Sequence, residues 1–233
     1  MKILALDTAT ASCSAALLLG QRLLQRQQLL ERGHAEAILP MVDELLTEAG
    51  MALASLTAIA FGRGPGAFTG VRLAASVTQG LAFGAGLPVV PVSDLQAIAQ
   101  RALDAERTVD RVLVCMDARM HEVYWGCFER SPVGLARAAG GEHVSHPAGV
   151  QLPAGWVGRQ PLAGAGPGFA AYPQLQAGLA LDVVPGELLP RAAEIARLAV
   201  PEVAAGRFFQ AEQALPEYLR DDVTRPPSGR SRN

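Results

Sequence analysis

The chain has 233 residues, half of them hydrophobic and 18% charged, a composition that can form one large domain or two small ones with a generous core. The formal net charge of −2 excludes a global attraction to nucleic acid or to an anionic membrane. No apolar run is long enough to span a bilayer. No signal peptide is recognisable after Met1, so we expect a cytoplasmic protein. Its cysteines lack metal-ligand or redox spacing, which predicts small core residues in a reducing compartment: Cys13, Cys115 and Cys127.

The first predicted elements are strands at residues 2–6 and 15–19, followed by a third strand or the start of a helix at 23–30. Asp7 ends the first strand. A carboxylate at this position can face a phosphate or Mg²⁺, and it can equally form a cap or an Asx-turn, so both interpretations stay open. Apolar residues at helical spacing then predict an amphipathic helix over 34–50.

A glycine-rich loop at residues 62–70 is the most distinctive stretch. It follows a short apolar strand predicted at 56–61 and precedes a helix of small residues predicted at 71–84. A further strand is predicted at 87–92. Strand, loop, helix and strand form a βαβ unit, and the loop lies at the carboxyl end of a strand, where such sheets bind ligands.

Two functions of this loop remain open. Its glycines permit close backbone approach, Thr69 can cap the helix that follows, and helix N-termini attract anions, which together favour a phosphate cradle. The loop is equally a tight turn that fits the helix against the sheet, and no Walker lysine is present. The candidate nucleotide or phosphate residues are Asp7, Gly64, Gly66, Thr69 and Gly70.

The second half of the chain repeats the opening pattern. After a helix predicted from Ser93 or Asp94 to about Leu103, an apolar strand at 112–116 ends in Asp117, and an alternating strand is predicted at 122–128. Asp7 and Asp117 are therefore pseudo-equivalent. Two related halves would place a cleft between them.

We accordingly predict an N-terminal lobe at residues 1–107 and a C-terminal lobe at 108–220. The last predicted helix, residues 190–205, can pack back on the first lobe. Residues 131–161 are expected to be irregular. A second glycine-rich turn is predicted at 162–168 and a short extended segment at 215–220, and the polar tail, residues 221–233, is expected to be flexible.

Four motifs occur in an order that resembles the bacterial TsaB (YeaZ) family: residues 3–10 (ILALDTAT), 32–36 (RGHAE), 64–72 (GPGAFTGVR) and 216–220 (PEYLR). The resemblance covers residues 1 to about 220 and is weaker from 130 to 190. Ala67 stands where the family usually has serine, which removes a hydroxyl from the loop and weakens the case for direct phosphate binding.

The resemblance implies an α/β fold of two lobes, of the actin-like, Hsp70-like and sugar-kinase-like (ASKHA) kind. It also implies a non-catalytic subunit that binds and activates a TsaD-type transferase. That transferase forms N6-threonylcarbamoyladenosine at position 37 of tRNAs that read codons beginning with A. The transferase's histidine metal pair aligns here with Asp94 and Ile98, and isoleucine cannot ligate a metal. We therefore expect neither catalytic nor metal-binding residues.

The implied partners are the TsaD-type subunit, a TsaE-type P-loop ATPase, a second copy of the chain in a homodimer, and tRNA through the complex. No cofactor is expected to be required, although weak ATP or ADP binding is compatible with the loop. Family members pair through helices that correspond to residues 34–50 and 70–84. The expected partner-binding residues are Ile38, Val42, Ala75, Ser76, Gln79, Gly80 and Phe83.

The main alternative is a small ATPase or kinase of the same superfamily, with Asp7 or Asp117 holding Mg²⁺ and ATP. A peptidase is disfavoured, because the sequence shows neither a zinc pair nor a Ser–His–Asp grouping.

Overall fold

The computed structural model describes residues 1–156, 161–179 and 181–220 of the chain. Its first sheet combines an antiparallel hairpin with parallel neighbours on the other side of the first strand. The central strands are buried along almost their whole length, as expected of a sheet that is covered on both faces. In sheet order the strands are β3 (Arg22–Leu29), β2 (Ser12–Leu19), β1 (Lys2–Asp7), β4 (Ala58–Gly62) and β5 (Val89–Val92).

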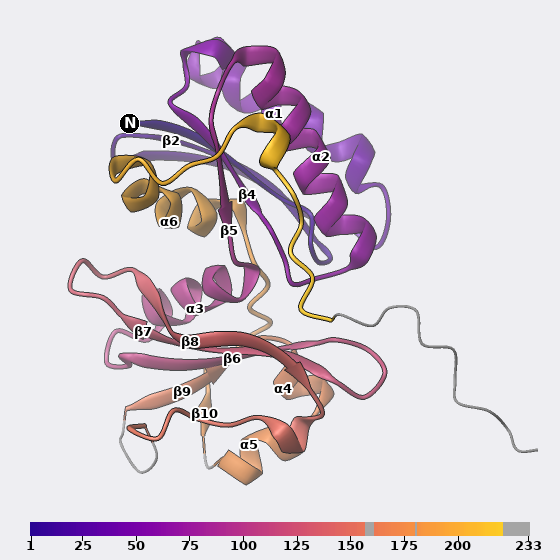
Figure 1. Cartoon of the computed structure of the whole chain (residues 1–233), viewed down its shortest axis with the longest axis vertical. Helices are drawn as coiled ribbons and strands as arrows, with labels where there is room; N and C mark the ends of the chain where they lie inside the picture. The colour runs from indigo at the N-terminus through magenta and orange to yellow at the C-terminus, as the bar shows by residue number, and fades with distance from the viewer. Residues whose placement is uncertain (157–160, 180, 221–233) are drawn as a thin grey trace, which may run out of the picture.

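Two long helices, α1 (His34–Ala49) and α2 (Phe68–Ala85), cover one face of this sheet (Figure 1). Between α1 and β4, the 3-10 helix η1 spans Leu53–Ser55. The apolar stripe of α1 packs mainly on β2, whose alternate residues Cys13, Ala15 and Leu17 lie in the same core, and α2 packs on β4 and β1; residues two apart in a strand lie on the same face. Gly50 closes α1 in a left-handed conformation with φ 62°, the usual role of glycine at a helix C-terminus.

The second sheet has the same topology as the first. Its central strand β6 pairs antiparallel with β7 and parallel with β9, as β1 does with β2 and β4. The internal repeat predicted from sequence is confirmed at the level of strand order. The strands in sheet order are β8 (Ala136–Ser145), β7 (Val123–Arg130), β6 (Arg111–Asp117), β9 (Leu162–Ala165) and β10 (Asp182–Val183).

Strand β8 corrects the expectation that residues 131–161 are irregular. Its sequence, ARAAGGEHVS, lacks alternating apolar residues, and much of it is exposed. The strand forms because β7 offers a row of backbone hydrogen-bond partners from Val123 to Arg130. It is irregular opposite Gly126 and Phe128, where the register shifts.

A middle layer of two helices joins the sheets, and the helices are exchanged relative to the order of the chain (Figure 1). Helix α6 (Ala192–Ala204) follows the second sheet in sequence and packs on β1, β2 and β4 of the first. Helix α3 (Asp94–Ala105) packs mainly on β6, β7 and β8 of the second sheet. The lobe boundary predicted from the sequence, after residue 107, placed this helix in the first lobe. One continuous core therefore runs from the first sheet through both helices to the second.

The far face of the second sheet is covered by short elements: η2 (Pro147–Gly149), α4 (Gly168–Ala171) and α5 (Gln174–Leu179). Cys115 and Cys127 are buried in this core, Cys13 is buried under α1, and all three are free thiols. Burial raises the pKa of Cys13 to about 11. These placements confirm the predicted role of the cysteines as small core residues.

After α6 the chain returns to the first lobe and then crosses toward the second. Phe209 forms an isolated antiparallel bridge with Val89 of β5, and the 3-10 helix η3 (Ala211–Gln213) lies beside α2. The predicted flexible tail at residues 221–233 lies outside the described residues. Over the described chain, no helix is long and apolar enough to cross a membrane.

Candidate functional site: the glycine loop, the cleft and the surface of α2

The glycine loop between β4 and α2 packs tightly on the turn between β1 and β2. A Cβ atom at Gly66 would lie 2.5 Å from the carbonyl oxygen of Ala9, and one at Gly70 would overlap the carbonyl oxygen of Thr8. The Thr8 hydroxyl in turn donates to the Gly70 carbonyl over 2.7 Å. Glycine is therefore required at both positions by packing within the chain, whether or not an anion binds there.

Helix α2 begins without a side-chain cap. Its N-cap is Ala67, where no side chain can accept a hydrogen bond from an unpaired amide. Thr69 lies inside the first turn and is exposed, so the prediction that Thr69 caps this helix is wrong. Its hydroxyl instead lies at the edge of a cleft between the lobes.

Asp7 forms a buried pair with Asp94, and both residues are completely inaccessible. Asp7 Oδ1 accepts a hydrogen bond from the Ala9 amide over 2.8 Å, and Asp94 Oδ2 accepts one from the Gly64 amide over 2.6 Å. Oxygen atoms of both carboxyl groups also approach the α-carbon of Gly62, where a Cβ atom would clash with them. The pair thus joins the end of β1, the glycine loop and the first turn of α3.

The burial and the raised pKa values of this pair favour a proton shared between the two carboxyl groups. Burial raises the pKa of Asp7 to about 6, against smaller opposing contributions from hydrogen bonds. Burial, and next the charge of Asp7, raise the pKa of Asp94 well above its usual value. Asp7 Oδ2 and Asp94 Oδ1 are buried without a donor, and a proton held between the two carboxyl groups satisfies both. Asp7 is fully buried beside the glycine loop and is not among the residues that line the cleft between the lobes.

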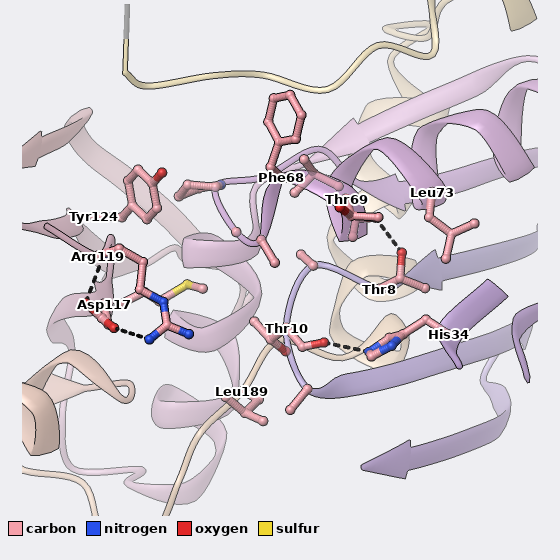
Figure 2. Close-up of a pocket in the computed structure, with 18 of the residues that line it drawn as sticks. Thr8, Thr10, His34, Phe68, Thr69, Leu73, Asp117, Arg119, Tyr124 and Leu189 are labelled. Carbon is pink, nitrogen blue, oxygen red and sulfur yellow. Dashed lines mark hydrogen bonds and ion pairs between the residues drawn. The ribbon is translucent and has the colours of Figure 1, made fainter. Parts of the chain in front are cut away.

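The cleft between the lobes has a volume of about 820 Å³ (Figure 2). The first lobe contributes Thr8, Thr10 and His34, and the His34 ring lies 2.8 Å from the Thr10 carbonyl oxygen, consistent with a local structural role. The lining of the cleft mixes arginines with carboxylates, so the cleft is not a strongly positive site. The charged residues that line it are Arg32, Arg119, Arg220, Glu31, Glu36, Asp117, Glu187 and Glu217.

Asp117 occupies in the second lobe the position that Asp7 occupies in the first. Each ends the central strand of its sheet, and each accepts a hydrogen bond from the amide two residues on, Arg119 and Ala9 respectively. The predicted pseudo-equivalence is thus visible in the geometry. The two differ in environment, because the Asp117 side chain is 31% exposed, faces the cleft and accepts a hydrogen bond from Tyr172 over 3.0 Å.

The residues expected to bind a partner divide into two groups. Ser76, Gly80 and Phe83 are exposed on α2, and Phe83 is 70% exposed. No atom would lie within 4 Å of a Cβ at Gly80, so the close approach expected at this glycine is not made within the chain. Gln79 is partly exposed and donates to the Glu212 carbonyl over 3.2 Å.

The second group is a correction. Ile38 and Val42 of α1 and Ala75 of α2 are buried in the core between these helices and the first sheet. They stabilise the helix pair from inside and offer no surface to another chain. Successive helical residues point about 100° apart, which is why Ala75 faces the core while Ser76 faces outward.

Metal-binding capacity is restricted by the residues around Asp94. Ile98, one helical turn further along α3, is fully buried and apolar. Across residues 1–156, 161–179 and 181–220, no group of three histidine, cysteine, aspartate or glutamate side chains could hold a metal ion.

The two lobes of equal topology, with a cleft between them, define an α/β protein of the actin-like, Hsp70-like and sugar-kinase-like class. The family model described as TsaD, tRNA N6-adenosine threonylcarbamoyltransferase, matches residues 24–206. The chain belongs to the family that this model describes and, within it, to the TsaB (YeaZ) proteins.

The relatives match over nearly the whole chain. The tRNA threonylcarbamoyladenosine biosynthesis protein TsaB of Escherichia coli is 41% identical over 229 residues, which are 96% of each chain. TsaB of Haemophilus influenzae is 38% identical over 232 residues, 96% of this chain and 95% of the relative. The structure of YeaZ from Pseudomonas aeruginosa superposes with a TM-score of 0.85 at 46% identity, covering 94% and 99% of the two chains. The family resemblance drawn from the four motifs is confirmed.

Proposed function

We propose that the chain is an accessory subunit in the biosynthesis of tRNA N6-threonylcarbamoyladenosine, and that it binds and activates a TsaD-type transferase. The observation that carries the proposal is the exposed stripe of α2 formed by Ser76, Gly80 and Phe83, where the described chain places no atom within 4 Å of a Cβ at Gly80. The names of the full-length relatives in E. coli and H. influenzae support the pathway. Ile98 is buried and apolar, and it stands at a position that aligns with a metal-binding histidine of the transferase, which supports a role other than catalysis.

The stripe suits a partner helix. Ser76 and Gly80 are four residues apart and lie on one face of α2, and their small size lets another backbone come close. Phe83, 70% exposed at the end of this face, supplies an apolar anchor of the kind that dominates interface energies. A homodimer would use the same surface in a two-fold arrangement, so homodimer and heterodimer are expected to exclude one another.

The finer parts of the proposal follow from the family. The transferred group goes to adenosine 37 of tRNAs that read codons beginning with A, and tRNA is bound through the complex and not by this chain alone. A TsaE-type P-loop ATPase is the third member. The chain works in the cytoplasm and requires no cofactor of its own.

The test is co-purification of the tagged full chain from its native cells, followed by mass spectrometry. We expect recovery of the TsaD-type subunit with the natural chain and its loss with Gly80→Leu. Gly178→Leu is the matched control, since Gly178 is also exposed on a helix, α5, with no atom within 4 Å of its Cβ position. Retention of the partner by Gly80→Leu would sink the proposal.

The second candidate is a small ATPase or kinase that acts alone. The cleft of about 820 Å³ with Asp117 at its wall favours it, whereas the burial of Asp7 beside the glycine loop counts against it. It predicts ATP turnover by the purified chain that Asp117→Asn abolishes. Equal turnover by both proteins would assign the activity to a contaminant and remove this candidate.

A further inference from the structure

The C-terminal segment that contains the PEYLR motif is attached at three places, the first of them on the first lobe. Phe209 and Val89 exchange two backbone hydrogen bonds of 2.9 Å, which add a residue to the open edge of β5. Three residues later, the Glu212 carbonyl accepts a hydrogen bond from Gln79 of α2. The segment therefore runs along α2 before it reaches the motif (Figure 1).

The second attachment lies at the glycine loop. The Glu217 amide donates to the Arg63 carbonyl over 2.8 Å, and the Glu217 carboxylate pairs with the Arg63 guanidinium. That guanidinium also pairs over 3.2 Å with Glu142 of the second lobe. The loop, the motif and β8 are thus joined through one arginine.

Tyr218 connects the same attachment to α2. Its hydroxyl accepts a hydrogen bond from Arg72 Nε over 2.6 Å, and its ring centroid lies 5.8 Å from that of Phe68. The Arg72 guanidinium also lies over the Phe68 ring, 3.6 Å from its centroid.

The third attachment is on the second lobe. The Arg220 guanidinium pairs with Glu122 and donates to the Ala118 carbonyl over 3.2 Å. These contacts hold the turn between β6 and β7, in which Arg119, Met120 and His121 have positive φ angles of 62°, 54° and 61°. Consecutive left-handed residues other than glycine are unfavourable, so this turn depends on the groups that hold it.

We propose that residues 216–220 form a latch between the lobes, which holds the cleft in its observed width and is released when a partner docks on α2. The release step rests on the proposed function. Its basis is geometric, because Arg72 and Gln79, which bind the segment, recur at helical spacing with Ser76 and Phe83 of the partner stripe. A partner seated on that stripe takes over the two side chains that hold the segment.

The latch has a thermodynamic consequence. If docking on α2 weakens the attachment of the segment, the attached segment weakens partner binding by the same factor, so release of the segment by mutation should raise the affinity for the partner. The cleft and the surface of α2 are then two linked sites within one chain.

The latch is tested first in the isolated full-length chain by hydrogen exchange. The Ala118 and Glu122 amides are hydrogen-bonded within the left-handed turn, and we expect Arg220→Ala to speed their exchange roughly tenfold, as fits the loss of charge-assisted hydrogen bonds. Arg137→Ala, which removes an arginine paired with Glu129 on neighbouring strands of the same lobe, should leave these rates unchanged. Unchanged rates in Arg220→Ala would overturn the latch.

A second variant separates a latch from a merely local contact. Tyr218→Ala removes the attachment to α2, because the hydrogen bond and the ring contact of Tyr218 are with Arg72 and Phe68 of that helix and not with the turn at residues 118–122. A latch transmits this loss, so the Ala118 and Glu122 amides should again exchange faster. Faster exchange in Arg220→Ala together with unchanged exchange in Tyr218→Ala would reduce the segment to a local support and overturn the proposal.

The release step is tested by adding the purified TsaD-type subunit. Faster exchange at Ala118 and Glu122 in the complex supports release by the partner, whereas unchanged exchange in a complex that has formed overturns it. If no complex forms, the proposed function fails, and the measurements on the isolated chain still decide the latch.

Discussion

Replacing Asp94 with asparagine should remove the part of the pH dependence of stability that Asp94 contributes to the buried pair. Asparagine keeps an acceptor for the Gly64 amide and provides a permanent donor to Asp7, in place of the shared proton. In the natural chain the folded state retains a proton that the unfolded state releases above its ordinary pKa of 3.8. The stabilisation is therefore complete below that pH and is lost as the pH rises through the raised pKa values, about 6 for Asp7 and well above the ordinary value for Asp94.

The magnitude follows from the number of protons. For each extra proton that the folded state holds, the free energy of unfolding falls by about 1.4 kcal/mol for every unit by which the pH rises. We expect the curves of the natural chain and Asp94→Asn, measured by urea unfolding at pH 5 to 8, to converge or cross as the natural chain loses stability with this extra slope. Asp43→Asn, on the exposed side of α1, should follow the natural chain. Parallel curves for Asp94→Asn and the natural chain would refute the shared proton.

Three further substitutions test the packing. Gly70→Ala should destabilise the chain by about 3 kcal/mol, since the new methyl group overlaps the Thr8 carbonyl. Gly80→Ala should stabilise the isolated chain by about 1 kcal/mol, because its site is open and alanine favours helix. Arg130→Ala should lower the free energy of unfolding by about 2 kcal/mol, because Nη2 of Arg130 donates to the carbonyl groups of Leu103, Glu106 and Val109 at the end of α3 and just beyond it. Urea unfolding measures all three, and a stabilising Gly70→Ala or a neutral Arg130→Ala would contradict the assigned contacts.

Local patterns were sufficient to predict the strands that build the repeat. The apolar runs that end in Asp7 and Asp117 identify β1 and β6, and the glycine loop identifies the start of α2. Strand β8 was missed because its small and polar residues carry no period of two, and its conformation is determined by its neighbour β7. A strand that is specified by its partner leaves little signal in its own sequence.

The pairing of Asp7 with Asp94 was equally hidden, because the two residues are far apart in sequence and meet only when α3 begins against the loop. The sequence offers Ser93 and Asp94 only as alternative caps of this helix, and the structure makes Ser93 the cap. The choice of Ile38 and Ala75 as partner residues failed for another reason. Amphipathic spacing identifies the apolar face of a helix, and in α1 and α2 that face is already covered by the chain's own sheet.

The exchange of helices between the lobes has a consequence for synthesis of the chain. One face of the first sheet is covered by α6, whose first residue is Ala192, although β5 ends at Val92. At 5–20 residues per second, the ribosome needs roughly 5–20 s to make the intervening stretch. During that interval α6 has not yet been made. The apolar face formed by residues such as Ile3, Ala5 and Val90 therefore lacks the helix that covers it in the folded chain. The nascent first lobe therefore keeps this face uncovered until α6 has been made, and a chain that ended after the second sheet would leave the first sheet without one of its two covering layers.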